Sequence, residues 1–395
     1  MGFTLVMPFL PLYFHLLGVG DAGRVAMWSG LSLGVTPAIT ALLAPFWGRL
    51  ADRFGRKIMV ERSLASFVVV MTAMAFVTSP WHVFALRAIQ GLFAGYGALT
   101  LTMAADVAPA GRMGQAIGTV QMAQRLGPAL GPVFGGSLAA LVGIRRAFMV
   151  AGACYLIALI VVFFMYHERP PLPRRGVGEA GSKAAAARVT FRNVLAFENF
   201  VLMAVVIFGL QFVDRSFGPI LPLFVAEIGI PPGRIPLISG LLFSIAAGAG
   251  AVGHHYCARL LRRRSATELI GGACAVAAGG GAVYVVAGDL FWLFLATPIF
   301  GLAIGVATTA AYTAAAAVIP ANVRGAGFGL LTTAALIGMA VSPVVSGLLG
   351  ATSIRAVWAL DVVGLVLLAV AVHRLGGGGD RAASTPPEEP VPENL

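Results

Sequence analysis

The chain has 395 residues, of which 58% are apolar and only 11% are charged, and its mean hydropathy is +0.90. Soluble domains carry about 25% charged residues, so this chain could not cover a soluble surface and most of it must face lipid. The net charge of +11 does not indicate nucleic-acid binding, because the basic residues form short clusters between long apolar runs. The three cysteines stand at unrelated spacings, which predicts neither a disulfide framework nor a metal site.

Twelve apolar runs follow one another along the chain. They cover residues 3–20, 27–47, 60–79, 83–106, 113–142 and 147–166, and then 199–226, 235–256, 267–287, 290–318, 326–350 and 354–374. In hydrocarbon every backbone polar group must be hydrogen-bonded internally, so runs of this length predict spanning helices. The predicted fold class is an all-α membrane protein with twelve transmembrane helices in two pseudo-symmetric six-helix bundles.

The first run is short for a membrane span. From Phe3 to Leu17 a helix would rise about 22 Å, against a hydrocarbon core of about 30 Å. It has neither the basic n-region nor the cleavage site of a signal peptide. We expect this first helix to be truncated.

Polar segments divide the chain into four parts. Residues 168–198 contain three prolines and six basic residues and predict a flexible linker, and the Gly-, Pro- and Glu-rich residues 375–395 predict a disordered tail. The two bundles are then residues 1–167 and 199–374. Of the 27 basic residues, 19 lie in loops and tail on the side of the termini and five lie on the other side. This bias predicts an inner-membrane protein whose two termini, linker and tail are cytoplasmic.

The two halves repeat at a near-constant offset. Pro8-Phe9-Leu10-Pro11-Leu12 returns after 211 residues as Pro219-Ile220-Leu221-Pro222-Leu223, and Ser29-Gly30-Leu31 returns after 210 as Ser239-Gly240-Leu241. Gly118, Gly127, Pro132 and Gly136 return after 211 as Gly329, Gly338, Pro343 and Gly347. Six spans per copy give both copies the same orientation, which predicts a substrate path between them.

Three motifs stand out against this background. The first, Gly48-Arg49-Leu50-Ala51-Asp52-Arg53-Phe54-Gly55-Arg56-Lys57, lies between spans 2 and 3, where Gly48 and Gly55 would permit a tight turn. The second is Arg87-Ala88-Ile89-Gln90-Gly91 in span 4, where a charged side chain needs a polar or charged partner or a water-filled cavity. The third combines Gly118, Gly127, Gly131, Pro132, Gly135 and Gly136 in span 5. Its glycines let another helix approach closely, and Pro132 would bend the span.

These motifs resemble those of the major facilitator superfamily, over nearly the whole chain, and in particular the twelve-span drug:proton antiporters of the tetracycline and multidrug efflux type. The resemblance implies a cytoplasmic latch that holds the halves together, formed by Gly48, Asp52, Arg53, Gly55, Arg56, Lys57 and Asp106. It implies proton transfer for Arg87 and an antiport direction for the span-5 motif. The residues alone also allow an ordinary basic loop, a structural arginine and static helix packing. The second-half loop, Ala258-Arg259-Leu260-Leu261-Arg262, has no acid, so any latch is one-sided.

Further charges fall inside the spans. Arg125 in span 5 and Asp214-Arg215 in span 7 lie near mid-membrane. A charge there costs free energy, so each of these residues is a candidate for a functional role. Burial disfavours a charged carboxylate and a nearby arginine favours it. We hypothesise that Asp214 is the principal proton-coupling acid, tuned by Arg125 or Arg215; the alternative is an ion pair that only orders the helices. Asp361 in span 12 is a weaker candidate because it lies nearer the outer surface.

The resembled fold places spans 1, 4, 7 and 10 around the substrate cavity. Their polar and aromatic residues include Tyr13, Tyr96, Phe208, Gln211, Phe212 and Tyr312. An aromatic, weakly polar cavity suits bulky amphipathic compounds, although such stripes also serve as packing.

The sequence therefore predicts a monomeric secondary transporter that exports small amphipathic or drug-like molecules in exchange for protons by alternating access. Its partners would be the substrate, protons and the bilayer, with a proton gradient in place of a cofactor. Metabolite uptake or facilitated diffusion, a non-transporting receptor or scaffold, and a membrane-embedded enzyme remain as alternatives. The last is disfavoured because the sequence has no His/Glu metal cluster, Gly-x-Ser-x-Gly or P-loop. The adjacent His254 and His255 are interpreted as interfacial.

Overall fold

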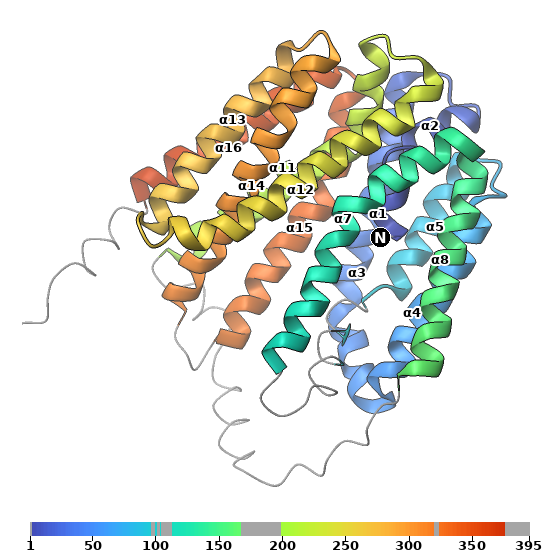
Figure 1. The fold of residues 1–395 in the computed structure, drawn as a ribbon, viewed down its shortest axis with the longest axis horizontal. Coiled ribbons are helices and arrows are strands. Elements are labelled where there is room, and N and C mark those ends of the chain that lie inside the picture. The colour runs from blue at the N-terminus through green and yellow to red at the C-terminus, as the bar shows by residue number, and fades with distance from the viewer. Residues whose placement is uncertain are drawn as a thin grey trace, which may run out of the picture.

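The protein is built from helices. The computed structural model describes residues 2–95, 99–100, 103, 113–166, 199–319 and 324–375, and in these ranges every regular element is helical (Figure 1). The first half contains α1 (Gly2–Val6), α2 (Leu10–Leu16), α3 (Ala22–Phe54), α4 (Arg56–Met74), α5 (Pro80–Phe93), α7 (Met113–Val142) and α8 (Ile144–Met165). The second half contains α11 (Phe200–Glu227), the short η1 (Pro232–Arg234), α12 (Ile235–Leu260), α13 (Ala266–Val286), α14 (Leu290–Val318), α15 (Arg324–Gly350) and α16 (Ile354–Leu375).

Eight of the described helices are long and apolar enough to cross a bilayer: they lie in α3, α8 and α11 to α16. Large apolar side chains point outward along them and their neighbours, including Leu42, Leu141 and Met165, which are 80%, 83% and 77% exposed. A soluble protein does not leave apolar surface open on this scale. The chain is therefore an integral, all-α membrane protein.

The first apolar run does not form one helix. α1 ends at Val6 and α2 begins at Leu10, and the intervening residues make short turn bonds, from Met7 N to Thr4 O and from Phe9 N to Val6 O. The prediction of a single, shortened helix over 3–20 is thus wrong. Pro8 and Pro11 lack the N–H groups that would bond back one turn. The matching Pro219 and Pro222 nevertheless lie inside the continuous α11.

The first motif, from Gly48 to Lys57, forms the ends of two helices and a one-residue turn between them rather than a loop. α3 continues through Gly48 to Phe54, and α4 begins immediately at Arg56. Gly55 alone makes the turn, at φ 96°, a left-handed conformation that favours glycine. The predicted turn at Gly48 is wrong, because that residue is helical.

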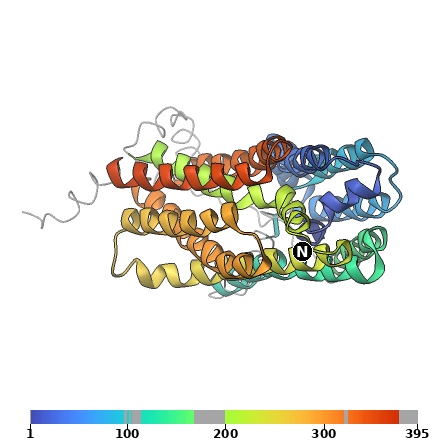
Figure 2. The same cartoon turned by 90° about the horizontal axis from the view of Figure 1, so that it is seen from above.

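The same helix pairs occur in both halves. In the first half α3 packs on α5 and α4 on α8; in the second half α12 packs on α14 and α13 on α16. The two most extensive contacts between the halves are the crossings of α3 with α15 and of α7 with α12. Viewed from above, the blue-to-green first half and the yellow-to-red second half occupy opposite ends of the molecule (Figure 2).

Glycines allow these two crossings. A Cβ on Gly30 of α3 would lie 2.8 Å from the Cα of Gly347 in α15, and one on Gly240 of α12 would lie 3.3 Å from the Cα of Gly136 in α7. Real Cβ atoms rarely approach other atoms so closely, so only glycine fits. The backbones of the two halves are therefore in direct contact at two places.

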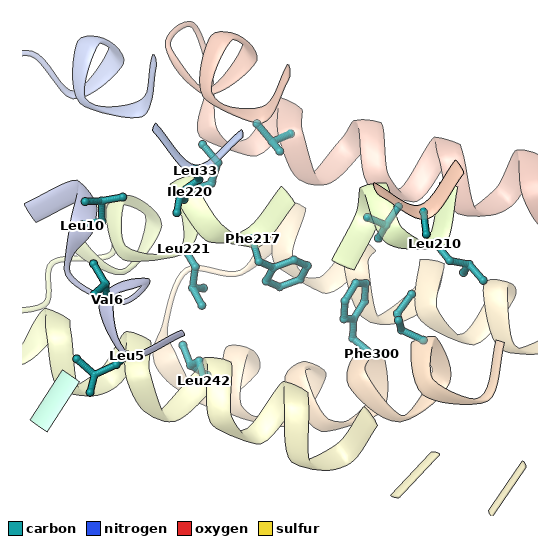
Figure 3. Close-up of a cluster of buried hydrophobic side chains, with 14 of the residues drawn as sticks. Leu5, Val6, Leu10, Leu33, Leu210, Phe217, Ile220, Leu221, Leu242 and Phe300 are labelled. Carbon is teal, nitrogen blue, oxygen red and sulfur yellow. The ribbon is translucent and has the colours of Figure 1, made fainter. Parts of the chain in front are cut away.

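Apolar side chains from both halves fill the space between the crossings. Leu5, Val6 and Leu10 of the first half belong to the same buried apolar cluster as Leu221 and Leu242 of the second half (Figure 3). Burial of these side chains, together with the glycine contacts, closes one region between the halves. The cavity described next adjoins this region.

Candidate functional site

A cavity of about 240 Å³ lies where α1 and α7 of the first half face the second half. Thr4, Met7, Pro128 and Pro132 line it from the first half. Most of its wall comes from α11, α12 and α14 and is apolar, with Leu221, Leu242, Phe243, Ala246, Ala247, Gly250, Ala251, Phe300, Gly301, Ile304 and Gly305. The polar side chains of the second half that line it are Asp214, Arg215, His254, Tyr284 and Thr297.

Asp214 and Arg215 form an ion pair in this wall. Arg215 Nε lies 3.4 Å from Asp214 Oδ2, and the side chains are 26% and 43% exposed for Arg215 and Asp214 respectively. A charge inside a membrane protein is tolerated where it faces a cavity or a partner, and both conditions hold here. The expectation of a desolvated Asp214 is wrong in this conformation, because the carboxylate faces the cavity instead of a packed interior.

Two further polar pairs tie the helices around the cavity. His254 Nδ1 of α12 lies 2.7 Å from Thr309 Oγ1 of α14. The hydroxyl oxygens of Tyr284 and Thr297 lie 2.5 Å apart, and Thr297 also donates to Leu293 O. Since a hydroxyl has one proton, Tyr284 is then the donor to Thr297. These contacts fix α12 and α13 against α14.

Arg215 also reaches a second cavity, of about 190 Å³, on the other side of α11. Met7 lines both cavities, and Thr36, Pro37 and Thr40 of α3 line only the second. α15 adds Leu336, Met339 and Pro343. Arg215 therefore lies between the two places where the halves cross, with the α7–α12 pair on one side and the α3–α15 pair on the other.

Arg87 lies apart from this ion pair. It is fully buried in α5, its Nη1 donates to Gln90 Oε1 at 2.9 Å, and its carbonyl accepts from Thr36 Oγ1 at 2.9 Å. It lines neither cavity, although Thr36 lines the second cavity together with Arg215. The side chain of Arg125, the other predicted partner, lies outside the described residues. Of the four predicted coupling residues the structure brings together two, Asp214 and Arg215.

The sequence and the fold were compared with known protein families and solved structures. A family model described as Major Facilitator Superfamily matches residues 1–334. The chain belongs to this superfamily. Among solved structures it is similar to a bacterial homolog of the human lysosomal transporter Spinster (TM-score 0.73, 16% identity, 100% of this chain and 95% of that one). It is also similar to a mutant of the nucleoside transporter NupG (TM-score 0.71, 16% identity, 95% and 96% of the two chains). At this identity the likeness concerns the fold.

Curated relatives are more similar in sequence. A "Multi-drug resistance efflux pump PmrA homolog" of Lactococcus lactis is 33% identical over 270 residues, 68% of this chain and 64% of that protein. A "Multidrug resistance protein MdtG" of Salmonella dublin is 35% identical over 244 residues, 62% and 59% of the two proteins. The match thus spans about three fifths of the length of these relatives. The superfamily match and these curated relatives indicate a transport protein and not an enzyme.

The predicted latch residues lie at the α3–α4 junction. Lys57 Nζ donates to Phe163 O of α8 at 2.9 Å and lies 3.7 Å from Glu61 Oε1, while the Arg53 guanidinium stacks on the ring of Phe54. Asp106 and the side chain of Asp52 lie outside the described residues. The contacts that are described join helices of the first half, and the latch across the two halves stays a prediction.

The span-5 glycines face two different neighbours. Thr4 Oγ1 of α1 donates to Gly127 O at 3.0 Å, and a Cβ on Gly135 would overlap the carbonyl of Leu5. Gly136 faces α12 instead. Next to Pro132, the amide of Val133 donates to Ser244 Oγ of α12 at 3.0 Å. Gly131 is buried, and Gly118, in the same helix, has no described surroundings.

The predicted cavity residues lie elsewhere. The Tyr13 hydroxyl donates to Met74 O within the first half, and Gly338 of α15 packs against Phe208, Gln211 and Phe212. Tyr312 is half-buried in α14, and Tyr96 lies outside the described residues. None of the five described side chains lines the 240 Å³ cavity.

Sequence reasoning missed several residues of the cavity. The interpretation of His254 as interfacial is incomplete, because the side chain is half-buried and faces the cavity. Thr297 is the repeat counterpart of Arg87, which was the signal that could have found it. Tyr284 and Phe300 carry no signal, because aromatic residues fill most spans. Among the described residues, no three His, Cys, Asp or Glu side chains gather in a group that would hold a metal ion.

Proposed function

We propose that this protein exports small amphipathic or drug-like molecules in exchange for protons, by alternating access. The observation that carries the proposal is the Asp214–Arg215 ion pair in the wall of an otherwise mostly apolar cavity to which both halves contribute. Apolar walls with a few convergent polar groups are typical of small-molecule sites. The names of the two curated relatives, both multidrug proteins, support this substrate class.

The helix pairs support two bundles related by a twofold axis. α3, α4, α5, α7 and α8 correspond by sequence offset to α12, α13, α14, α15 and α16. The two crossing pairs are equivalent: the repeat relates Gly30 to Gly240 and Gly136 to Gly347, so the contact of Gly30 with Gly347 is the counterpart of the contact of Gly240 with Gly136. With α1–α2 and α11 as the first spans of the two halves, this gives twelve spans. The bundles would rock about the glycine contacts.

Proton coupling would use the ion pair. The carboxylate of Asp214 accepts a proton from the side of higher proton concentration, which removes its attraction for Arg215. Arg215 is then free to turn toward the second cavity, and substrate competes for the vacated position. Arg87 and Arg125 would tune this exchange. A proton gradient supplies the drive, since one charge moved through 100 mV is worth about 2.3 kcal/mol.

The proposal also covers the membrane location, the oligomeric state and the orientation of the protein. We place the protein in the cytoplasmic membrane as a monomer, with both termini in the cytoplasm, as the basic-residue bias predicts. The 240 Å³ cavity is smaller than the roughly 300–1,000 Å³ of drug-sized sites. A rocking motion that opens it is therefore part of the mechanism.

The experiment is a flux assay in everted vesicles with an imposed pH gradient and a fluorescent amphipathic dye. Proton-driven dye accumulation is expected for the wild type and its loss for Asp214→Asn. Glu227→Gln is the matched control, because Glu227 lies on the same helix with a similarly exposed side chain but outside the cavity. Full proton-driven transport by Asp214→Asn would rule out its coupling role, and dye movement in the wild type that ignores the pH gradient would favour facilitated diffusion.

A further inference from the structure

Asp361 is a buried acid in α16 that is not part of the Asp214–Arg215 ion pair. Its side chain is 2% exposed, and it lies seven residues into the helix, about 10 Å from the start of α16. It is set behind the cavity wall: Trp358, one turn earlier, packs with ring centroids 4.5 Å from Phe217 and 4.9 Å from Tyr284, and both of these line the cavity.

Within the described part of the chain, Asp361 has a single hydrogen-bond partner. Oδ2 lies 2.5 Å from Ser216 Oγ of α11, and Oδ1 is buried with no hydrogen-bond partner. Ser216 Oγ also lies 2.8 Å from Val213 O, a carbonyl that can only accept. The serine hydroxyl has a single proton. If Ser216 gives that proton to Val213, then Asp361 must itself be the donor in the bond to Ser216.

The helices packed around Asp361 bring no cation to it. On α11 the charged groups are Asp214 and Arg215, which pair with each other at the cavity, and Glu227, which pairs with Arg355. α13 carries Glu268, Cys274 and Tyr284, and from Gly327 onward α15 carries no ionisable side chain. On α16 itself, Arg355 lies at the start and His373 and Arg374 at the end. Within these described residues a carboxylate at 361 would be a buried charge with one donor and no counter-charge, a costly arrangement that a neutral acid avoids.

We propose that Asp361 is a proton-binding site: a neutral carboxylic acid that donates from Oδ2 to Ser216, which in turn donates to Val213 O. On release, the Oδ2–H bond breaks, the proton passes to water, and the Ser216 hydroxyl turns from Val213 O to the new carboxylate. Ser216 follows Asp214 and Arg215 directly in α11. Reorientation of the Ser216 hydroxyl therefore alters hydrogen bonding in the same helical turn that carries the ion pair. Any use of this proton in transport rests on the proposed function; the proton site itself does not.

Infrared difference spectroscopy of the full chain in lipid tests the site without any transport assay. Wild type minus Asp361→Asn should show, at neutral pH, the C=O band of a protonated carboxyl group and no carboxylate bands. Asn is the chosen substitute because its amide can still donate to Ser216. Asp289→Asn is the control: Asp289 is exposed and caps α14 through Phe291 N, so its difference spectrum should contain only carboxylate bands.

Ser216→Ala supplies a second test that removes only a hydroxyl group. Without its acceptor the O–H of Asp361 loses its hydrogen bond, and the C=O band should move to higher frequency. The proposal is overturned if wild type minus Asp361→Asn shows carboxylate bands alone. Should Asp361→Asn not fold, an unshifted carboxyl spectrum in Ser216→Ala overturns it equally. If the band is present while Asp214→Asn transports normally, the site stands and the proposed coupling role of Asp214 fails.

Discussion

The backbone of Gly240 in α12 lies against that of Gly136 in α7, so that a Cβ on either would overlap a carbonyl of the other helix, that of Pro132 or Pro236. Gly30 and Gly347 repeat this contact between α3 and α15. The two halves of the molecule thus touch at equivalent glycines on both sides of α11, and the ion pair of α11 lies between them.

Gly136→Ala and Gly240→Ala should each destabilise the protein, because the new methyl group meets a backbone carbonyl that cannot move aside easily. Overpacking of this kind costs about 1–3 kcal/mol. The measurement is the melting temperature in detergent. Gly279→Ala in α13 is the control, since nothing lies within 4 Å of its Cβ position; there alanine should be neutral or slightly stabilising. Equal melting temperatures for all three variants would contradict the close crossing.

Ser244 and Pro132 should be energetically coupled. Ser244→Ala leaves the Val133 N–H without its acceptor, at a cost of about 1–3 kcal/mol. Pro132→Ala restores an N–H and relieves the ring's clash with the preceding turn, so that Val133 can bond within its own helix. In a double-mutant cycle on melting, Ser244→Ala should therefore cost little in the Pro132→Ala background. An unchanged cost in both backgrounds would show that the need for the Val133–Ser244 bond does not depend on Pro132.

Gln90 should support Arg87. Gln90→Leu removes the acceptor of the Arg87 Nη1 bond inside the first half, and hydrogen bonds to charged groups contribute about 1.5–3 kcal/mol. The melting temperature should fall, whereas Ile89→Val, on the exposed face of the same helix, should change it little. Dye flux is measured on the same samples. A fall in flux no larger than the loss of folded protein would assign Arg87 a structural role and argue against proton transfer.

The charge of the cavity should set substrate preference. Asp214→Asn leaves Arg215 without its counter-charge and should disfavour cationic dyes relative to neutral ones, and Arg215→Gln should do the reverse. One unit charge at about 4 Å in water is worth about 1 kcal/mol, roughly a fivefold change in relative Kd. Competition between a cationic and a neutral dye for binding to the purified protein measures this ratio in each variant and does not require transport. The same ratio in all proteins would mean that substrate does not approach the pair.

The sequence by itself determined the membrane class, the helical runs and the repeat. Each depends on local composition or on spacing: a run of about twenty apolar residues has no stable alternative to a helix in lipid, and a constant offset is visible without coordinates. The repeat also found Gly30, Gly136, Gly240 and Gly347, the four glycines that touch. It could not show which pairs would touch, because that depends on how the two bundles dock.

Only the tertiary structure decided which side chains share a cavity. The sequence grouped Arg87 with Asp214 because both are charges inside spans, yet α5 turns Arg87 into the first half, while α11 turns Asp214 to the cavity and Ser216 toward α16. Successive helical residues point about 100° apart, so neighbours in the chain meet different surroundings. From the expected depth in the membrane, the sequence ranked Asp214 above Asp361 as a buried acid. The structure reverses that order of burial, because the exposure of a side chain depends on the neighbours that the fold brings to it.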